Sequence, residues 1–188
     1  MANVLIPIAP GCEELEAVTI IDLLRRADIS VTTASLDSGS QVTPVTASRG
    51  VVLIPDITLD DAMGEDYDMI VLPGGLPGAE HLDNDKRIHL LLEKMAREDK
   101  YTAAICAAPK ILANAKLLEG KSATSYPGFI DKMDLKNTRI KADSVVSDGK
   151  VITSRGPGTA MDFALTLVAA LAGEEKRAEV AAGVLWTN

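Results

Sequence analysis

Residues 103–110, with the sequence AAICAAPK, contain the feature that decides the fold of this chain. The apolar run Thr102–Ile105 is typical of a buried strand, and it ends at Cys106. The small residues that follow crowd a turn little, and Pro109 suits the first turn of a helix, where its missing N–H costs nothing. The stretch therefore predicts a tight strand-to-helix turn that exposes the Cys106 thiol, a geometry used to present nucleophiles.

The setting of Cys106 also leads to an expectation about its ionisation. Open amides at a helix N-terminus favour negative charge, so the helix that follows is expected to give the thiol thiolate character. A buried, inert core cysteine is the alternative interpretation of the same residues.

Strand-like and helix-like segments alternate along the rest of the chain. Short apolar or β-rich runs predict strands at 4–8, 29–36, 51–54, 69–72 and 122–124, and a hairpin of 144–146 with 151–153 turned by Asp148-Gly149. Amphipathic or apolar patterns predict helices over 13–26, 85–98, 159–171 and 174–184. This alternation predicts an α/β fold, a doubly wound sandwich with a mostly parallel sheet and helices on both faces. Without repeats or linkers, residues 1–188 are expected to form one domain.

Composition narrows the classes of function. The net charge of -8 argues against electrostatically driven binding of nucleic acid, which requires a basic surface. No apolar run reaches the length of a membrane span, and the first residues lack the basic region of a signal peptide. The chain has two cysteines, Cys12 and Cys106, without disulfide or metal spacing, and no His-Glu pair has metal-ligand spacing. We therefore expect a cytoplasmic protein with no membrane, metal or cofactor requirement.

Three strand ends are expected to converge on one site, because ligands of such sheets bind outside the carboxyl ends of the strands. Gly74 and Gly75 follow the strand 69–72 and allow close approach of the backbone. Their amides, with that of Ala107, predict a pocket for a developing oxyanion next to Cys106. A plain turn is the alternative for the glycine pair.

Glu16 is the candidate proton-transfer residue. It lies near the apolar stripe of the first helix, where partial burial would raise its pKa and let it hydrogen-bond a thiolate. The neighbouring Glu13 and Glu14 are explained by the helix dipole alone. The glycine-rich turn 154–158 before a helix suits an anion, although a structural helix start is the default interpretation.

Five segments in this order and spacing closely resemble the ThiJ/PfpI superfamily, over nearly the full length of the chain. They are PGCEELEAVTIIDLLRRADI, ASRGVV, YDMIVLPGG, AAICAAPKILA and TSRGPGTAMDFAL. The nearest branch is that of the Parkinson's-disease-linked protein deglycase and its bacterial relatives. The resemblance implies a flavodoxin-like sandwich, a homodimer, a nucleophilic and peroxide-sensitive Cys106, and Glu16 as its hydrogen-bonding acid.

The resemblance also assigns roles to residues around the site. Gly75 and Ala107 match the amides that bind the oxyanion. Arg49, Ser154 and Arg155 match polar positions of the pocket and dimer contact, and Arg26 matches a residue that reaches the partner's site.

One position departs from the family pattern. Where several relatives have a histidine near the cysteine, this chain has Tyr126. A phenol with a pKa near 10 cannot relay protons at neutral pH as histidine does, so proton transfer is left to Glu16.

Two functional hypotheses follow, with a weaker third. The first is a glutathione-independent glyoxalase or deglycase that acts through Cys106 on methylglyoxal, glyoxal or their adducts, with protection against oxidative stress. The second is a redox-sensing stress protein or chaperone in which Cys106 oxidises to the sulfinate. A cysteine peptidase is the third, disfavoured by Tyr126.

Overall fold

A mostly parallel sheet forms the centre of the molecule. The computed structural model describes residues 2–187, so residues 1 and 188 of the expected domain lie outside the described part. Within it, the sheet has the order β10-β11-β7-β6-β1-β2-β5, and every neighbouring pair is parallel except β10–β11. The strands are β1 (Asn3–Ile8), β2 (Ser30–Ser35), β5 (Ile57–Thr58), β6 (Met69–Leu72), β7 (Tyr101–Ile105), β10 (Val145–Asp148) and β11 (Val151–Ser154). The order of the parallel strands is that of flavodoxin-like proteins, as predicted.

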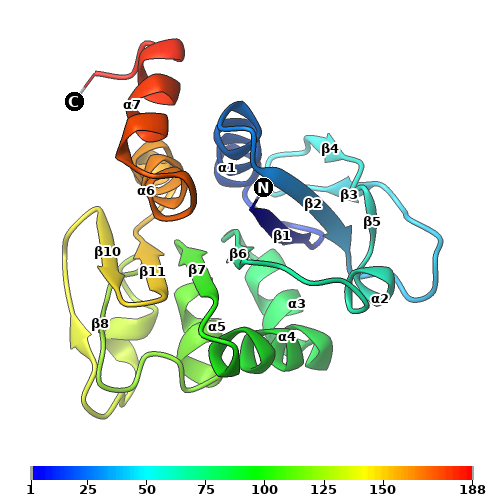
Figure 1. Cartoon of the computed structure of the whole chain (residues 1–188). Coiled ribbons are helices and arrows are strands. Elements are labelled where there is room, and N and C mark those ends of the chain that lie inside the picture. Colours follow the sequence, from blue (N-terminus) through cyan, green and yellow to red (C-terminus); the bar gives the residue numbers. More distant parts are fainter. Residues whose placement is uncertain (1, 188) are drawn as a thin grey trace.

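Helices cover both faces of this sheet (Figure 1). One face packs against α1 (Glu14–Arg26), α6 (Ala160–Ala172) and α7 (Glu174–Gly183), and the other against α2 (Leu59–Ala62), α3 (Gly78–Asn84), α4 (Lys86–Arg97) and α5 (Pro109–Asn114). In β1, Val4 and Ile6 join the core under α1 and α6, whereas Leu5 joins the core under α4 and α5. A strand buried on both faces needs apolar residues at every position, which explains its continuous apolar run.

Two predicted strands belong to small ribbons outside the main sheet. The predicted strand 51–54 contributes β4 (Val52–Leu53), which pairs antiparallel with β3 (Val45–Thr46). The predicted strand 122–124 contributes β8 (Ser122–Ala123), which pairs with β9 (Arg139–Ile140). Short 3-10 turns occur at Ile130–Lys132 and Pro157–Thr159.

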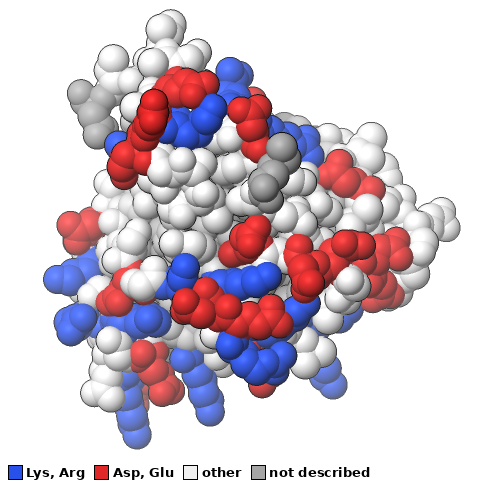
Figure 2. Space-filling view, in the orientation of Figure 1, with Lys and Arg blue, Asp and Glu red and all other residues white. Residues whose placement is uncertain are grey.

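Charged side chains are intermingled on the face shown in Figure 2, where neither sign forms an uninterrupted surface. Among residues 2–187, no helix is both long and apolar enough to cross a bilayer.

Candidate active site

The candidate site lies at the carboxyl edge of the sheet, where the loops after β1 and β6 meet. The strand order reverses between β1 and β6, since β2 lies on one side of this pair and β7 on the other. Ligands of such folds usually bind at this switch point. The Glu13 N–H donates to the Gly74 carbonyl at 2.9 Å, which joins the two loops. Cys106 follows β7, the neighbour of β6.

Cys106 stands on a sharp turn between β7 and α5, as predicted. Its φ of +63° is in the left-handed region, which costs a non-glycine residue roughly 1–2 kcal/mol. Hydrogen bonds on both sides hold this conformation: the Cys106 N–H donates to the Ser154 carbonyl at 3.1 Å, and the Cys106 carbonyl accepts the Tyr126 N–H at 2.9 Å. Pro109 begins α5. The thiol is half-buried, so the interpretation as an inert core cysteine does not describe it.

Glu16 is fully buried beside this thiol. Its Oε2 accepts the Gly74 N–H at 2.9 Å, and its carboxyl hydrogen-bonds the Cys106 side chain. Its Oε1 is buried without a nitrogen or oxygen partner among the described residues. The Glu13 side chain accepts the Glu16 N–H at 2.8 Å, which caps α1 and fixes Glu16 in its first turn.

The two glycines allow these groups to approach one another. A Cβ on Gly74 would lie 2.6 Å from the Cys106 Cβ and 2.8 Å from Glu16 Oε2, so any side chain there would separate the pair. Gly75 has a φ of +88°, and a Cβ on it would lie 2.4 Å from the Glu13 nitrogen. Both positions therefore require glycine.

The environment raises the pKa of both acidic groups. Burial raises the pKa of Glu16 to about 7, against the lowering effect of the Gly74 N–H and the Cys106 side chain. Burial, followed by the Glu16 charge, raises the pKa of Cys106 to about 12, although the N–H groups of Gly75 and Ala107 hydrogen-bond the thiol and oppose the rise.

The expectation that the helix N-terminus lowers the thiol pKa is therefore wrong for the chain with an ionised Glu16. The helix α5 has only 6 residues, and its N-terminal field is weaker than desolvation and the nearby carboxylate. Protonation of Glu16 removes the effect of the nearby carboxylate on the thiol pKa.

A hollow of about 390 Å³ lies near the Cys106 turn, and Tyr126 and Arg155 line it, whereas Cys106 and Glu16 do not. Tyr126 is 49% exposed, and its backbone N–H contacts Cys106 as described. Arg155 Nη1 donates to the Ala142 carbonyl at 2.8 Å. Ser154 is fully buried, and its hydroxyl bonds the Ser144 carbonyl and Thr159 Oγ1, both at 2.7 Å. The Ser154 side chain thus supports the turn, whereas Tyr126 and Arg155 face the hollow.

The predicted arginines on the N-terminal side lie further out. Arg49 is exposed, and its backbone N–H donates to Glu14 Oε1 at 2.8 Å. Arg26 ends α1, ten residues or about 15 Å from Glu16 along the helix, and pairs with Asp22 at 2.7 Å. Within one chain, Arg26 does not reach the site.

Sequence analysis missed the role of Glu14. This side chain is only 8% exposed and accepts hydrogen bonds from Ser48 Oγ and the Arg49 N–H, each at 2.8 Å. It therefore fastens the β3–β4 ribbon to the start of α1. No local signal distinguishes it from its acidic neighbours, because its partners come from more than 30 residues away.

The two histidines and the second cysteine take structural positions. His81 Nδ1 lies 3.0 Å from the Pro10 carbonyl, and His89 Nε2 lies 2.8 Å from the Asp83 carbonyl. Cys12 is fully buried, and burial raises its pKa to about 12. Residues 2–187 contain no group of three or more His, Cys, Asp or Glu side chains that could hold a metal ion.

The fold and the site together define a flavodoxin-like α/β protein that carries a cysteine on a strained strand-to-helix turn, next to a buried carboxyl. The profile of the DJ-1/PfpI family matches residues 2–170, and the chain belongs to this family.

Curated relatives agree with this assignment. Drosophila melanogaster "Protein DJ-1alpha" is 44% identical over 186 residues, which cover 98% of this chain and 84% of that protein. Caenorhabditis elegans "Glutathione-independent glyoxalase DJR-1.2" is 35% identical over 175 residues, with 93% and 90% coverage. The chain spans less than half of two Arabidopsis thaliana relatives, 40% of DJ-1 homolog B and 46% of DJ-1 homolog A, at 45% and 44% identity.

Solved structures show the same fold. Drosophila melanogaster DJ-1beta superposes with a TM-score of 0.92 at 41% identity, covering 100% of this chain and 99% of that one. Toxoplasma gondii DJ-1 in its oxidized form also gives a TM-score of 0.92, at 37% identity and full coverage of both chains.

Proposed function

We propose that this chain is a cofactor-free enzyme that uses Cys106 to convert methylglyoxal or glyoxal, free or bound in adducts with amines and thiols, into hydroxy acids. The observation that carries the proposal is the pair of Glu16 and Cys106, brought together across Gly74. A nucleophile and a carboxyl whose pKa is raised to about 7 are the two groups that such a reaction needs. The relative named a glutathione-independent glyoxalase supports this choice of substrate class.

The ionisation of Cys106 is coupled to that of Glu16. Two negative charges at this separation repel, so Cys106 ionises more readily when Glu16 holds a proton. The N–H groups of Gly75 and Ala107 lower the pKa of Cys106, and they would stabilise the thiolate that results.

The reaction then needs one nucleophilic step and one proton transfer between carbons. The thiolate attacks the aldehyde carbon and forms a C–S bond, and the alkoxide takes the proton from Glu16. The Glu16 carboxylate removes the hydrogen from that carbon to give an enediolate, and returns it to the adjacent carbon to give a thioester. Water breaks the C–S bond, releases lactate from methylglyoxal and restores the thiol. One carbon is oxidised as its neighbour is reduced, so the electrons balance within the substrate.

Deglycation follows from the same chemistry. Adducts of methylglyoxal with amines and thiols form reversibly, and removal of the free aldehyde draws them toward dissociation. The hollow lined by Tyr126 and Arg155, which lies near Cys106 without including it, is the proposed place for part of a bound adduct.

The test is lactate formation from methylglyoxal without glutathione. We expect turnover in the wild type, loss of turnover in Cys106→Ser, and retention in Cys12→Ser, the matched control for the second thiol. Turnover in Cys106→Ser equal to that of the wild type would exclude the proposed nucleophile.

A second function, redox sensing by Cys106, is favoured by the exposure of the thiol together with the adjacent buried carboxyl. The solved Toxoplasma gondii relative in oxidized form is consistent with it. Oxidation to the sulfinate adds two oxygen atoms, and a protonated Glu16 would hydrogen-bond the product. Intact-mass measurement under graded peroxide should show arrest at this product in the wild type and further oxidation in Glu16→Ala. Arrest at the same product in both proteins would remove Glu16 from this role.

We also propose that two copies of the chain form a homodimer through the surface beside the site. Leu15 and Val18 of α1 are 50% and 45% exposed, and Val51 and Val52 of the adjoining ribbon are 47% and 58% exposed. An apolar surface of this kind favours a protein partner, and a second copy would give Arg26 a route to the other site. Sedimentation equilibrium should give the mass of two chains, and Val18→Asp should give the mass of one. The two free thiols suit the reducing cytoplasm, where we place the protein.

A further inference from the structure

A second hollow lies at the amino edge of the sheet, at the opposite end of β7 from Cys106. It has a volume of about 400 Å³, within the usual range for small-molecule sites. Its walls come from the end of α4, the first residues of β7, the segment after α5 and the β10–β11 turn. β7 runs from Tyr101 to Ile105, so the strand separates the hollow from Cys106 by roughly 16 Å at 3.3 Å per residue.

Three lysines line this hollow, in a chain with a net charge of -8. Lys100, Lys121 and Lys150 are all half-buried, and Asp99 is the one acidic residue among the lining residues. Lys100 lies 3.9 Å from Glu98, at the limit of an ion pair. A concentration of positive charge in a half-enclosed space attracts anions.

Two of these ammonium groups are free to bind a further charge. In the described residues, the lysines that form ion pairs are Lys94, Lys100 and Lys176, and neither Lys121 nor Lys150 has a carboxylate within 4.0 Å. Lys121 Nζ donates a hydrogen bond to the Asp148 carbonyl at 3.4 Å, and, together with the Ser122 N–H, its charge helps to lower the pKa of the Asp148 carboxyl. Lys150 Nζ lies 4.1 Å from the centre of the Tyr101 ring, a cation–π contact that holds the ammonium at the wall of the hollow.

Most of the remaining lining is apolar, apart from Asp99 and Thr102. Leu117, Val151 and the Tyr101 ring contribute hydrocarbon surface next to the ammonium groups. A site that combines apolar walls with a few convergent charged groups selects a ligand with an apolar body and a charged end.

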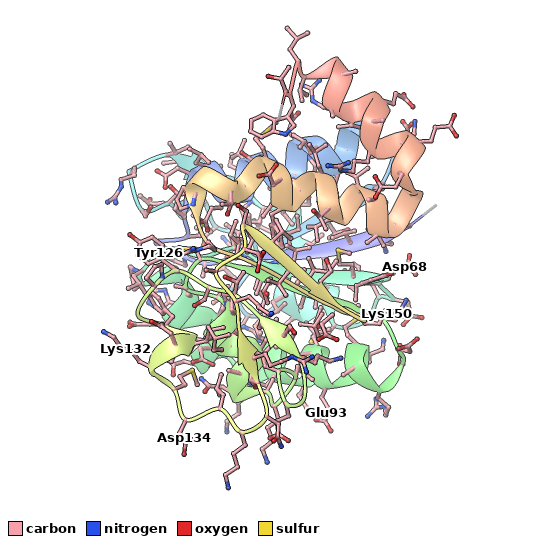
Figure 3. All side chains as sticks on the ribbon, turned by 90° about the vertical axis from the view of Figure 1, so that its left-hand side faces the viewer. Asp68, Glu93, Tyr126, Lys132, Asp134 and Lys150 are labelled. Carbon is pink, nitrogen blue, oxygen red and sulfur yellow. The ribbon has the colours of Figure 1, made fainter. Side chains whose placement is uncertain are left out.

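We propose that this hollow is a binding site for a small organic anion, one whose carboxylate or phosphate is held by Lys121 and Lys150 and whose body is about the size of a single ring. Figure 3 shows Lys150 and Tyr126 on opposite sides of the molecule, so the site is separate from the hollow near the Cys106 turn.

In the experiment, small probes are titrated into the ¹⁵N-labelled protein, and the amide chemical shifts are recorded at each addition. The probes are benzoate, phenyl phosphate and the neutral benzyl alcohol. We expect saturable shifts of residues 99–102, 121 and 149–151 with one or both anions, and no saturable shifts there with benzyl alcohol. Comparison of benzoate with phenyl phosphate distinguishes a carboxylate site from a phosphate site.

Lysine variants test which side chains bind the charge. Lys121→Gln and Lys150→Gln should each weaken binding of the preferred anion by about tenfold, since each removes one charge-assisted hydrogen bond. Lys132→Gln is the matched control, because Lys132 is exposed and lies far from Lys150 (Figure 3), and it should leave the affinity unchanged. The amide spectrum of each variant reports that it is folded.

Three results would overturn the proposal. They are no saturable shift with either anion, equal binding of the neutral probe, and equal affinities in the wild type and both hollow variants. Lactate formation by Cys106 is measured separately and does not enter into this test, so each proposal can fail alone.

Discussion

Glu14 and Glu16 lie two positions apart at the start of α1, yet their surroundings shift the pKa of the carboxyl in opposite directions. On the ribbon side, burial alone would raise the pKa of Glu14, but hydrogen bonds from its own backbone, Ser48, Arg49 and Val51 hold it below its usual value. On the sulfur side, Glu16 receives one backbone N–H, and burial raises its pKa to about 7. The larger number of donors at Glu14 and the deeper burial of Glu16 together decide which carboxyl stays charged.

The largest expected effect is on the rate of catalysis, where Glu16 and Glu14 should differ. Glu16→Gln should lower the rate of lactate formation by about 10²–10⁴-fold, because the amide cannot transfer the proton between carbons. Glu14→Gln is the matched control, since it makes the same change two residues away, and its rate should fall far less. Measurement of kcat on methylglyoxal decides this. Equal losses in the two variants would show that Glu16 acts only through the packing of α1.

The second prediction concerns stability and pH. The pKa of Glu16 is raised from 4.5 to about 7 on folding, so its contribution to stability is complete below about pH 4.5 and is lost as the pH rises through 7. The loss amounts to about 3 kcal/mol at 1.36 kcal/mol for each pKa unit. Urea denaturation of the wild type and Glu16→Gln between pH 4 and 8 should show a difference that grows over this window. A difference independent of pH would contradict the raised pKa.

The contribution of Glu14 to stability should depend on pH in the opposite direction to that of Glu16. Because the pKa of Glu14 is lowered on folding, its contribution is present above its unfolded pKa and is lost as the pH falls through the lower folded value. At neutral pH, Glu14→Ala should therefore destabilise the fold by about 1–3 kcal/mol, since Ser48 and Arg49 lose their acceptor. Urea denaturation at pH 7 measures this. Ser48→Ala, which removes one of these donors, should cost less, and a larger loss in Ser48→Ala would argue against the carboxylate as the anchor.

The smallest effect is expected at Tyr126. Its contact with Cys106 is made by the backbone N–H, which any residue except proline supplies. Tyr126→Phe should therefore change kcat by less than about threefold, because the substitution keeps this backbone N–H and removes only the side-chain hydroxyl. A loss comparable to that of Glu16→Gln would assign the hydroxyl a part in proton transfer.

The sequence predicts the main sheet and most helices because these elements carry strong periodic patterns. The continuous apolar run of β1 and the Asp148-Gly149 turn are local signals, and the structure contains both elements. The strands β3, β5 and β9, which the sequence does not predict, have two residues each, too few to show a period. The turn at Cys106 was predictable from local residues, whereas the raised thiol pKa was not, because it depends on Glu16, ninety positions earlier.

The two hydrogen bonds that hold the Cys106 turn, together with the position of Glu16, give the site an order of assembly. Glu16 leaves the ribosome long before the cysteine, and the carbonyl of Ser154 that receives the Cys106 N–H is made almost fifty residues after it. Until β11 pairs with β7, the left-handed turn lacks one of the two hydrogen bonds that hold it. The full support of this turn is therefore acquired late in synthesis, and a chain that stops before β11 would lack it.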